Sequence, residues 1–317
     1  MRFFHGTKID FVGKRHIFFW VSLTINVVGI LAVLLMGIEY GIDFEGGTEL
    51  AYQFSKPIHT DQIRKAVENA GIKDPEIKSF GQSNQYLVRV KYATDLDKKI
   101  HESFKKNFPE EQVLTLKVDK IGPKIGIELR NQAFLAVFFA IIAIMIYVAF
   151  RFEFSYGFGA VIALIHDVIL TFVVIVVVNK TGLVNLEINQ SIVAAMLTVV
   201  GFSVNDTVII FDRIRENVKE KQKGVGYLKL VNLSINETLS RTINTVLTVV
   251  IVLLTLVLLG GPVLQGFAFT MLIGIITGTY SSIYIASAFV IWYLGKFKKI
   301  NLEEDDPKLT GLKTAKA

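Results

Sequence analysis

The stretch GFSVNDTVIIFDRIREN (residues 201–217) closes a long apolar run that begins at residue 188. Inside it, Asn205 and Asp206 stand next to each other, well before the first basic residue, Arg213. An apolar run of about 20 residues is what an α-helix needs to cross a membrane. At 1.5 Å per residue, Asp206 lies roughly 10 Å inside the membrane region. Because an acid at that depth is costly, we expect it to face other helices and to be functional.

The same kind of apolar run recurs along the chain. Of the 317 residues, 52% are hydrophobic and only 20% are charged, with a mean hydropathy of +0.49. This composition is that of a membrane protein. We predict six membrane-spanning helices, at residues 17–36, 133–150, 156–178, 188–211, 242–259 and 266–293, and all six prolines fall outside them. The basic flank of the first span resembles a signal sequence, but no small-residue cleavage site follows, so we expect an uncleaved anchor.

The distribution of Lys and Arg predicts the orientation of these helices. Residues 1–16 carry four, the connection 212–241 carries seven, and the chain after Tyr293 carries six. The turns 179–187 and 260–265 carry one between them, Lys180. Basic residues favour the cytoplasmic side. We therefore expect a cytoplasmic N-terminus (1–16) and a cytoplasmic tail (294–317). The net charge of +6 then reflects topology, and we expect no nucleic-acid partner.

Residues 37–131 have the composition of a soluble domain and would lie outside the cytoplasm. Alternating or β-branched patterns predict strands at 48–54, 75–81, 85–92 and 113–121. Amphipathic patterns predict helices at 60–71 and 95–108. The order β-α-β-β-α-β is typical of a ferredoxin-like α+β domain, a fold that by itself fixes no function.

Several kinds of chemistry are missing from the sequence. There is no cysteine, so no disulfide, thiol nucleophile or thiolate metal site can form. The phosphate-binding G-x-x-x-x-G-K-[ST] loop, the H-E-x-x-H metal motif and the G-x-S-x-G serine motif are all absent. Of the five histidines, only His166 lies in a span, which argues against a histidine metal site. We expect a protein that is not an enzyme, holds no cofactor or metal, and is driven by an ion gradient or a partner.

Asp206 is the first candidate functional residue. Ala195, Thr198 and Asn205 share one broad helical face with it, so a small and polar stripe surrounds the acid. The alternative is a purely structural polar contact between helices. A second polar pair, His166 and Asp167, lies near the middle of the third span, with Thr171 one turn further on. This pair either makes a hydrogen bond between packed helices or relays protons.

Arg241, at the predicted start of the fifth span, is the candidate counter-charge of Asp206. Thr242, Thr245 and Thr248 continue a polar edge from it. An arginine would favour the charged carboxylate and burial the neutral one, so its protonation would respond to small movements. The alternative is an ordinary interfacial anchor. In the last span, small residues recur every four positions, which predicts close helix packing; they are Gly274, Gly278, Ser282 and Ala286. We assign no chemistry to the charged segment 212–216.

Four segments together resemble the SecD/SecF family, and within it the six-span SecF subunits of the bacterial protein-export machinery. They are YGIDFEGGTEL (40–50), HDVILTFVV (166–174), TVVGFSVNDTVIIFDRIREN (198–217) and ETLSRTINTVLT (237–248). The resemblance covers nearly the whole chain in order. It implies that Asp206 and Arg241 take part in proton passage, with Asn205, His166, Asp167 and Thr245 as supporting polar residues. Phe202 departs from the family, which often carries Tyr there, and Gly46–Gly47 would permit a tight turn.

The family belongs to the superfamily of proton-driven RND-type efflux pumps. The resemblance implies a subunit that, with SecD, uses the proton motive force to promote late steps of protein translocation across the bacterial cytoplasmic (inner) membrane. The implied partners are SecD, the SecYEG channel, YajC, the exported unfolded polypeptide and membrane lipid.

Three other functions fit the same features less well. A half-unit of a small-molecule efflux transporter would usually need a larger external domain. An intramembrane aspartyl protease would need Asp167 and Asp206 at matched depth. A scaffold without transport activity would leave the intramembrane acid and arginine unexplained.

Overall fold

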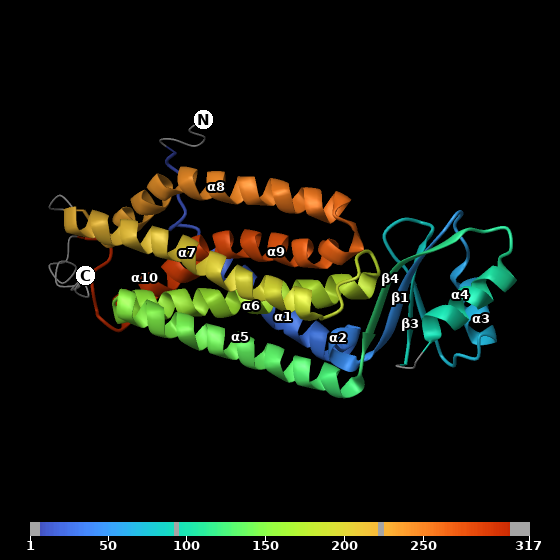
Figure 1. Ribbon diagram of the computed structural model, residues 1–317. Coiled ribbons are helices and arrows are strands. Elements are labelled where there is room, and N and C mark those ends of the chain that lie inside the picture. Colours follow the sequence, from blue (N-terminus) through green and yellow to red (C-terminus); the bar gives the residue numbers. More distant parts are fainter. Residues whose placement is uncertain (1–6, 92–94, 221–224, 305–317) are drawn as a thin grey trace.

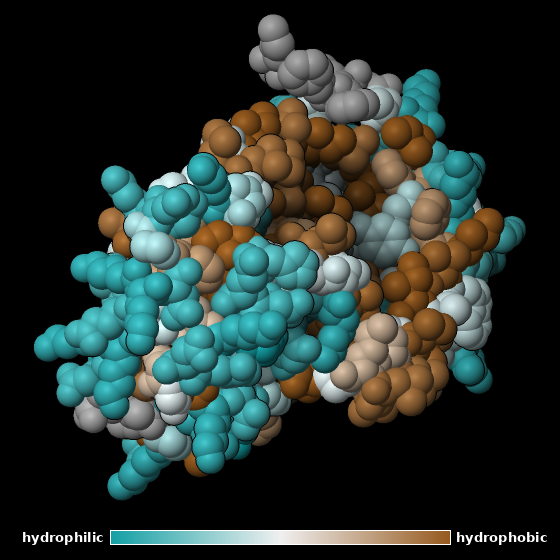
Figure 2. Space-filling model, turned by 90° about the vertical axis from the view of Figure 1, so that its right-hand side faces the viewer, coloured by the Kyte–Doolittle hydropathy of each residue, from teal (hydrophilic) through white to brown (hydrophobic). Residues whose placement is uncertain are grey.

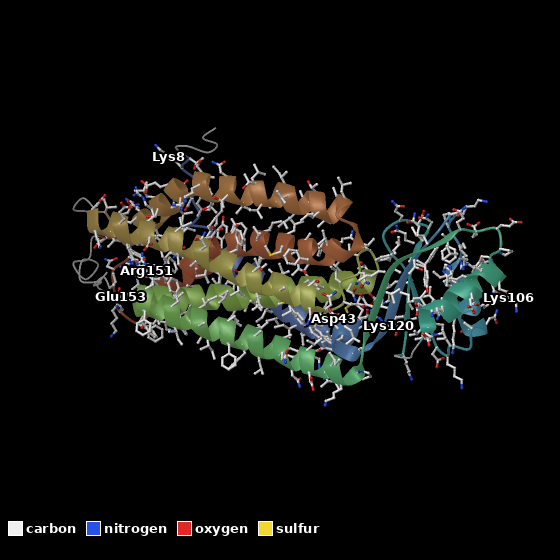
Figure 3. The ribbon with its side chains drawn as sticks, in the orientation of Figure 1. Lys8, Asp43, Lys106, Lys120, Arg151 and Glu153 are labelled. Carbon is white, nitrogen blue, oxygen red and sulfur yellow. The ribbon has the colours of Figure 1, made fainter. Side chains whose placement is uncertain are left out.

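The computed structural model describes residues 7–91, 95–220 and 225–304. A bundle of long helices carries a small sheet domain at one end (Figure 1). The opposite end of the bundle holds the segment before the first span and the start of α8 (Tyr227–Leu259) (Figure 1). There the Ile9 N–H donates to Asn236 Oδ1 at 2.9 Å. Figure 3 shows Lys8, Arg151 and Glu153 at that end and Lys106 at the far tip of the sheet domain.

Within the described residues, six helices are long and apolar enough to cross a membrane, which confirms the predicted six-span fold. Five of them are continuous: α1 (Arg15–Met36), α5 (Pro123–Arg151), α6 (Phe154–Thr181), α7 (Gln190–Glu220) and α8 (Tyr227–Leu259). The sixth is composite. It runs through α9 (Gly261–Ser281), the π-helical turn η1 (Ser282–Ala286) and α10 (Ser287–Lys296).

Several helices are longer than the apolar runs suggest. α5 begins at Pro123, where the missing N–H of proline costs no helical hydrogen bond. α7 continues to Glu220 and α8 already begins at Tyr227, so most of the connection 212–241 is helical. Arg241 consequently lies inside α8 rather than at its start. The early part of α8 stays helical because its buried residues recur at helical spacing: Tyr227, Leu230, Val231, Ser234, Ile235 and Thr238.

The segment between α1 and α5 folds as the expected α+β domain. Its elements are β1 (Gly47–Phe54), α3 (Thr60–Asn69), β2 (Glu76–Ser79), β3 (Gln85–Val90), α4 (Leu96–Asn107) and β4 (Val113–Ile121), preceded by the short α2 (Ile42–Glu45). The strands pair antiparallel in the order β2-β3-β1-β4, as in a ferredoxin-like fold. Tyr52 of β1 packs edge-on against Phe104 of α4 in the domain core. Viewed from this end, hydrophilic side chains gather at the lower left and hydrophobic ones lie above them and to their right (Figure 2).

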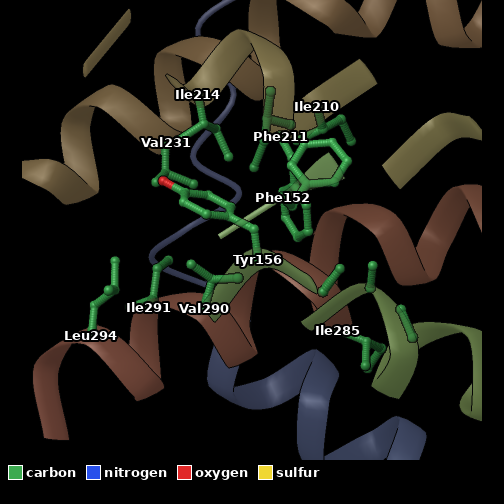
Figure 4. Packing of buried hydrophobic residues seen from close by; sticks show 14 of the residues in the cluster. Phe152, Tyr156, Ile210, Phe211, Ile214, Val231, Ile285, Val290, Ile291 and Leu294 are labelled. Carbon is green, nitrogen blue, oxygen red and sulfur yellow. The ribbon is translucent and has the colours of Figure 1, made fainter. Parts of the chain in front are cut away.

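The helices of the bundle differ in how deeply they are buried. In the most apolar stretch of each span, 39% of α6, 44% of α7 and 56% of the last span are buried, against 6% of α5 and 11% of α8. Near the end away from the sheet, Tyr156 of α6 packs against Phe211 of α7 and residues of α10 (Figure 4). α6, α7 and the last span, the three central spans, also carry most of the buried polar side chains of the bundle.

Two glycines connect the sheet domain to the helices. Gly46 and Gly47 have φ values of +76° and +145°, a region that side-chain-bearing residues rarely adopt. A Cβ on Gly46 would lie only 2.6 Å from Pro123 Cα, and one on Gly126 would lie 2.9 Å from Gly46 N. The pair therefore lets the chain turn into β1 while the start of α5 passes directly beside it.

Candidate functional site

A polar cluster lies inside the bundle around Asp167 of α6. The Asp167 side chain is fully buried. Its Oδ2 accepts hydrogen bonds from Ser203 Oγ of α7 at 2.5 Å and from Ser281 Oγ of α9 at 2.6 Å. One carboxylate thus joins the three central spans.

His166 extends this cluster to a fourth helix. Its Nδ1 lies 2.9 Å from Asp167 Oδ1, and its Nε2 contacts the hydroxyl of Ser22 on α1. Ser22 is itself buried. The result is a hydrogen-bonded chain from Ser22 through His166 to Asp167 and on to Ser203 and Ser281, which we call the Asp167 cluster. The sequence singled out His166 and Asp167 but not the three serines.

Close packing of α9 against α7 brings the serines within reach of Asp167. A Cβ on Gly278 would lie 3.1 Å from Ser203 Cβ, and one on Gly274 would lie 2.2 Å from a Val199 methyl group. These two predicted packing residues therefore face α7. Ser282, the third, begins the π-helical turn, and its hydroxyl donates to Thr279 O at 2.9 Å. The packing role of all three stays a prediction that substitution can test.

Asp206 lies on the same α7–α9 interface, three residues after Ser203. It is 6% exposed, and its Oδ2 accepts a hydrogen bond from Thr279 Oγ1 of α9 at 3.2 Å. The predicted polar stripe around it is divided: Ala195 is buried, whereas Thr198 and Asn205 are exposed. Asp206 and its neighbour Asn205 thus face different surroundings.

Arg241 and Thr245 lie on α8, on the exposed side of the bundle. The Thr245 hydroxyl donates to the backbone carbonyl of Arg241 at 3.1 Å. Arg241 lines a cavity of about 1230 Å³ together with Thr238 and with Val208 of α7. Among the described residues no ion pair joins Arg241 to Asp206, whose hydrogen-bond partner is Thr279. The expected counter-charge is therefore near the acid's helix but not paired with it here.

A second charged cluster joins the sheet domain to the bundle, and sequence reasoning missed it. Glu187, in the turn between α6 and α7, is 4% exposed. It forms ion pairs with Arg89 of β3 and, at 2.6 Å, with Lys78 of β2. Arg89 also contacts Glu49 of β1 at 3.0 Å. We call these four residues the Glu187 cluster.

The Glu187 cluster extends to the end of α1. Glu39 accepts a hydrogen bond from Lys180 of α6 at 2.6 Å and lies 3.7 Å from Lys78. The bond from Lys180 and the nearby charge of Lys78 hold the pKa of Glu39 below its ordinary value, although burial acts the other way. Burial instead raises the pKa of Glu49, because the contact with Arg89 offsets it only in part. Burial would lower the pKa of Arg89, but its bonds to Glu187 and Glu49 raise it.

The described residues contain no group of three or more His, Cys, Asp or Glu side chains that could hold a metal ion. The expectation that the protein works without a cofactor is not tested by this finding. The chemistry of the Asp167 cluster suits the binding and release of protons. The ion pairs of the Glu187 cluster suit a contact between the sheet domain and the bundle.

Comparison with known proteins gives matches over most of the chain. Residues 99–296 match the family described as "Protein export membrane protein SecD/SecF, C-terminal", and residues 32–58, which contain Gly46 and Gly47, match the "SecD/SecF GG Motif". The protein translocase subunit SecF of Calditerrivibrio nitroreducens is 39% identical over 292 residues, 90% of this chain and 94% of that protein. The SecF subunit of Escherichia coli O157:H7 is 37% identical over 298 residues, 91% of this chain and 88% of that protein.

Solved structures give the same result for the fold. The crystal structure of SecDF, a translocon-associated membrane protein from Thermus thermophilus, matches 93% of this chain with a TM-score of 0.81 and 34% identity. The chain spans 40% of the length of that SecDF protein. A second SecDF structure, in a form called super-membrane-facing, matches with a TM-score of 0.67 and 33% identity.

Proposed function

Because the chain belongs to the SecD/SecF family of protein-export membrane proteins, we propose that it is the SecF-type subunit of a Sec protein translocase and that a proton gradient drives its work. The observation that carries the proposal is the match to SecF subunits over about nine-tenths of the chain, with its six spans and external domain. The proposal includes neither an enzymatic activity nor a cofactor. The alternative of an efflux half-unit finds no support in the small external domain.

The proposed coupling residue is Asp206. It is buried between α7 and α9, and among the described residues its carboxylate has one hydrogen-bond partner, the neutral hydroxyl group of Thr279. A carboxylate without a fixed counter-charge gains or loses a proton more readily than one held in an ion pair. Arg241 lines the cavity that reaches Val208, two residues after Asp206. In our proposal this cavity brings water to the arginine, which pairs with Asp206 at one stage of the cycle.

The proposed main partner is SecD, since the similar solved chains are SecDF proteins. Asn205 on α7 and Thr245 on α8 are exposed polar residues within predicted membrane spans. Exposed polar groups are unfavourable in lipid and are expected to face protein or water. We propose that spans of SecD cover this side of α7 and α8. SecYEG, YajC and the exported polypeptide remain further proposed partners.

We also propose that the protein lies in the bacterial inner membrane with both termini in the cytoplasm. The excess of Lys and Arg in residues 1–16, in 212–241 and after Tyr293 supports this orientation. The sheet domain, at the opposite end of the bundle (Figure 1), would then meet the exported chain outside the cytoplasm.

The test is completion of protein export in membrane vesicles with and without a proton gradient, with the ATP-driven early stage intact. We expect the gradient to speed completion with the native chain and not with Asp206→Asn. The matched control is Asp61→Asn, the same change at an exposed position on α3. An unchanged gradient response of Asp206→Asn, at normal abundance and assembly, would refute the proposed coupling role.

A further inference from the structure

We propose that Asp167 is a second proton-binding site, separate from Asp206, and that its protonation releases the π-helical turn of the last span from α6. This goes beyond the proposed function, because it concerns another acid and does not depend on which work the protein performs. It starts from one arrangement: a fully buried carboxyl group, a histidine bonded to it, and a serine that ends α9 directly before the π-turn.

The partners of Asp167 fit an ionised carboxylate that can be discharged. Its Oδ2 accepts two hydroxyl hydrogen bonds, from Ser203 and Ser281, and its Oδ1 faces His166. An ionised carboxylate only accepts hydrogen bonds, whereas a protonated one carries a donor on one oxygen. The proton arrives at Oδ1, the oxygen that faces His166. The neutral group then lacks the negative charge that strengthens the two serine bonds at Oδ2, so the contact with Ser281 can open.

The side chains that face Asp167 are a histidine and two serines. His166 faces it from α6, Ser203 from α7 and Ser281 from α9. On the far side of His166 lie Ser22 of α1 and the ring of Tyr280, whose centroid is 6.3 Å from that of the histidine. Among the described residues no Lys or Arg forms an ion pair with Asp167, in contrast to Glu187.

The chain Ser22–His166–Asp167 gives the proton a route. His166 Nε2 takes the hydroxyl proton of Ser22, His166 Nδ1 passes its own proton to Asp167 Oδ1, and a hydronium ion gives a proton back to Ser22. Two O–H bonds, in the hydronium ion and in Ser22, and the N–H bond at Nδ1 break. Two O–H bonds, in Ser22 and in Asp167, and one N–H bond at Nε2 form, so one proton moves from hydronium to the carboxylate and the imidazole changes tautomer. Imidazole suits this relay because it binds and releases protons near neutral pH.

The consequence for structure lies in α9. Ser281 is its last α-helical residue, and η1 follows at Ser282–Ala286. π-Helical turns are rare, short and frequent at functional sites. The bond from Ser281 to Asp167 fixes the start of this turn against α6. Thr279, two residues earlier, holds Asp206. A change at Asp167 therefore reaches Asp206 through the end of α9.

A buried hydroxyl is available for the protonated form. Thr171 lies one helical turn after Asp167 and is fully buried, and its hydroxyl has no hydrogen-bond partner among the described residues. An unpartnered buried hydroxyl is unfavourable and gains from a new bond. We assign it the role of accepting the proton of neutral Asp167.

The test is infrared difference spectroscopy of the full protein in lipid vesicles after a step in pH, which detects the C=O band of newly protonated carboxyl groups. With ¹³C-aspartate incorporated, we expect two shifted bands in the native protein. Asp206→Asn should remove one and Asp167→Asn the other. If the Asp167→Asn spectrum keeps every band of the native one, Asp167 does not take up a proton and the proposal is wrong.

A milder variant covers the case in which Asp167→Asn does not fold. Ser281→Ala leaves the acid in place but removes one donor to its ionised form. In Ser281→Ala, we expect the C=O band of protonated Asp167 to appear at about tenfold lower proton concentration than in the native protein. This is the effect of one lost hydrogen bond to a charged group. The control is Ser191→Ala, at an exposed position of α7. If Ser281→Ala titrates as the native protein does, the cluster is a structural brace only.

Discussion

The Glu187 cluster and the Asp167 cluster both centre on a carboxylate with almost no exposure, 4% and fully buried respectively. Outside the bundle, Glu187 is held by two full positive charges, Arg89 and Lys78. Inside it, Asp167 is held by two hydroxyl groups and a histidine. Fixed charges keep a carboxylate ionised over a wide pH range, whereas neutral donors leave protonation possible. The first arrangement suits a permanent connection between domains and the second a switch.

The largest expected effect comes from breaking the connection at Arg89. Arg89→Met would leave Glu187 and Glu49 facing each other without their shared guanidinium group. Removing one partner of a buried ion pair costs about 3–5 kcal/mol. We expect the sheet domain to separate from the bundle, seen as a longer and broader distance between spin labels at the exposed positions Lys105 and Leu183.

Two further variants check this reading. Lys106→Met, at an exposed position of α4, should leave the distance between the labels unchanged. The double variant Arg89→Met with Glu187→Leu removes both charges and should restore much of the contact, because a buried ion pair can be replaced by apolar side chains. If Arg89→Met alone keeps the native distance between the labels, without broadening, the backbone contact between Gly41 and Ile188 is enough to hold the sheet domain against the bundle.

Removing one neutral hydrogen-bond donor from Asp167 should lower the stability less than removing the charge of Arg89 does. Ser203→Ala would remove one hydroxyl from Asp167 without changing the helix. A hydrogen bond to a charged group contributes about 1.5–3 kcal/mol, and we expect a loss of about 2 kcal/mol. Reversible unfolding in detergent with denaturant would measure it against Ser191→Ala. Equal stability of the two variants would contradict the view that Asp167 is ionised in this state.

The sequence predicted the spans and the sheet domain, because hydropathy and alternation are local signals. Deep ionisable residues are rare, so His166, Asp167 and Asp206 also stood out. Their partners did not: Ser22, Ser203 and Ser281 are small polar residues that occur in many helices, and only the packing brings them to one carboxylate.

The rest of what the sequence missed has a similar physical reason. Glu187 lies in a turn without periodicity, and its partners Lys78 and Arg89 lie in another domain. The early start of α8 was detectable, since the apolar residues Leu230, Val231 and Ile235 recur at helical spacing. Hydropathy gives the length of a membrane span, whereas the length of the helix depends on what it packs against.

The third prediction asks how far the inner cluster depends on close packing. Gly274→Ala places a methyl group 2.2 Å from a Val199 methyl group, whereas Gly201→Ala on the exposed face of α7 meets nothing within 4 Å. Overpacking lowers the free energy of unfolding by about 1–3 kcal/mol, and the better helix propensity of alanine offsets about 1 kcal/mol of this loss. We expect a net loss of about 1 kcal/mol for Gly274→Ala and a small gain for Gly201→Ala, measured by the same unfolding experiment. The reverse order would contradict a packing role for Gly274.

The smallest effect should come from the exposed edge of the Glu187 cluster, and it has a defined sign in pH. Since the pKa of Glu39 is below its ordinary value of 4.5, its contribution is complete at neutral pH and is lost as the pH falls through the lowered pKa. Glu49, with its raised pKa, acts in the opposite direction. Glu39 is 38% exposed, so the contact with Lys180 contributes only about 0.5 kcal/mol and less at high salt. Glu39→Gln should therefore widen the spin-label distance slightly at pH 7, and the difference from the native chain should shrink as the pH falls below 4.5 and vanish once the pH is below the lowered pKa of Glu39. A difference that does not shrink on acidification would contradict the contribution of the ionised Glu39 side chain.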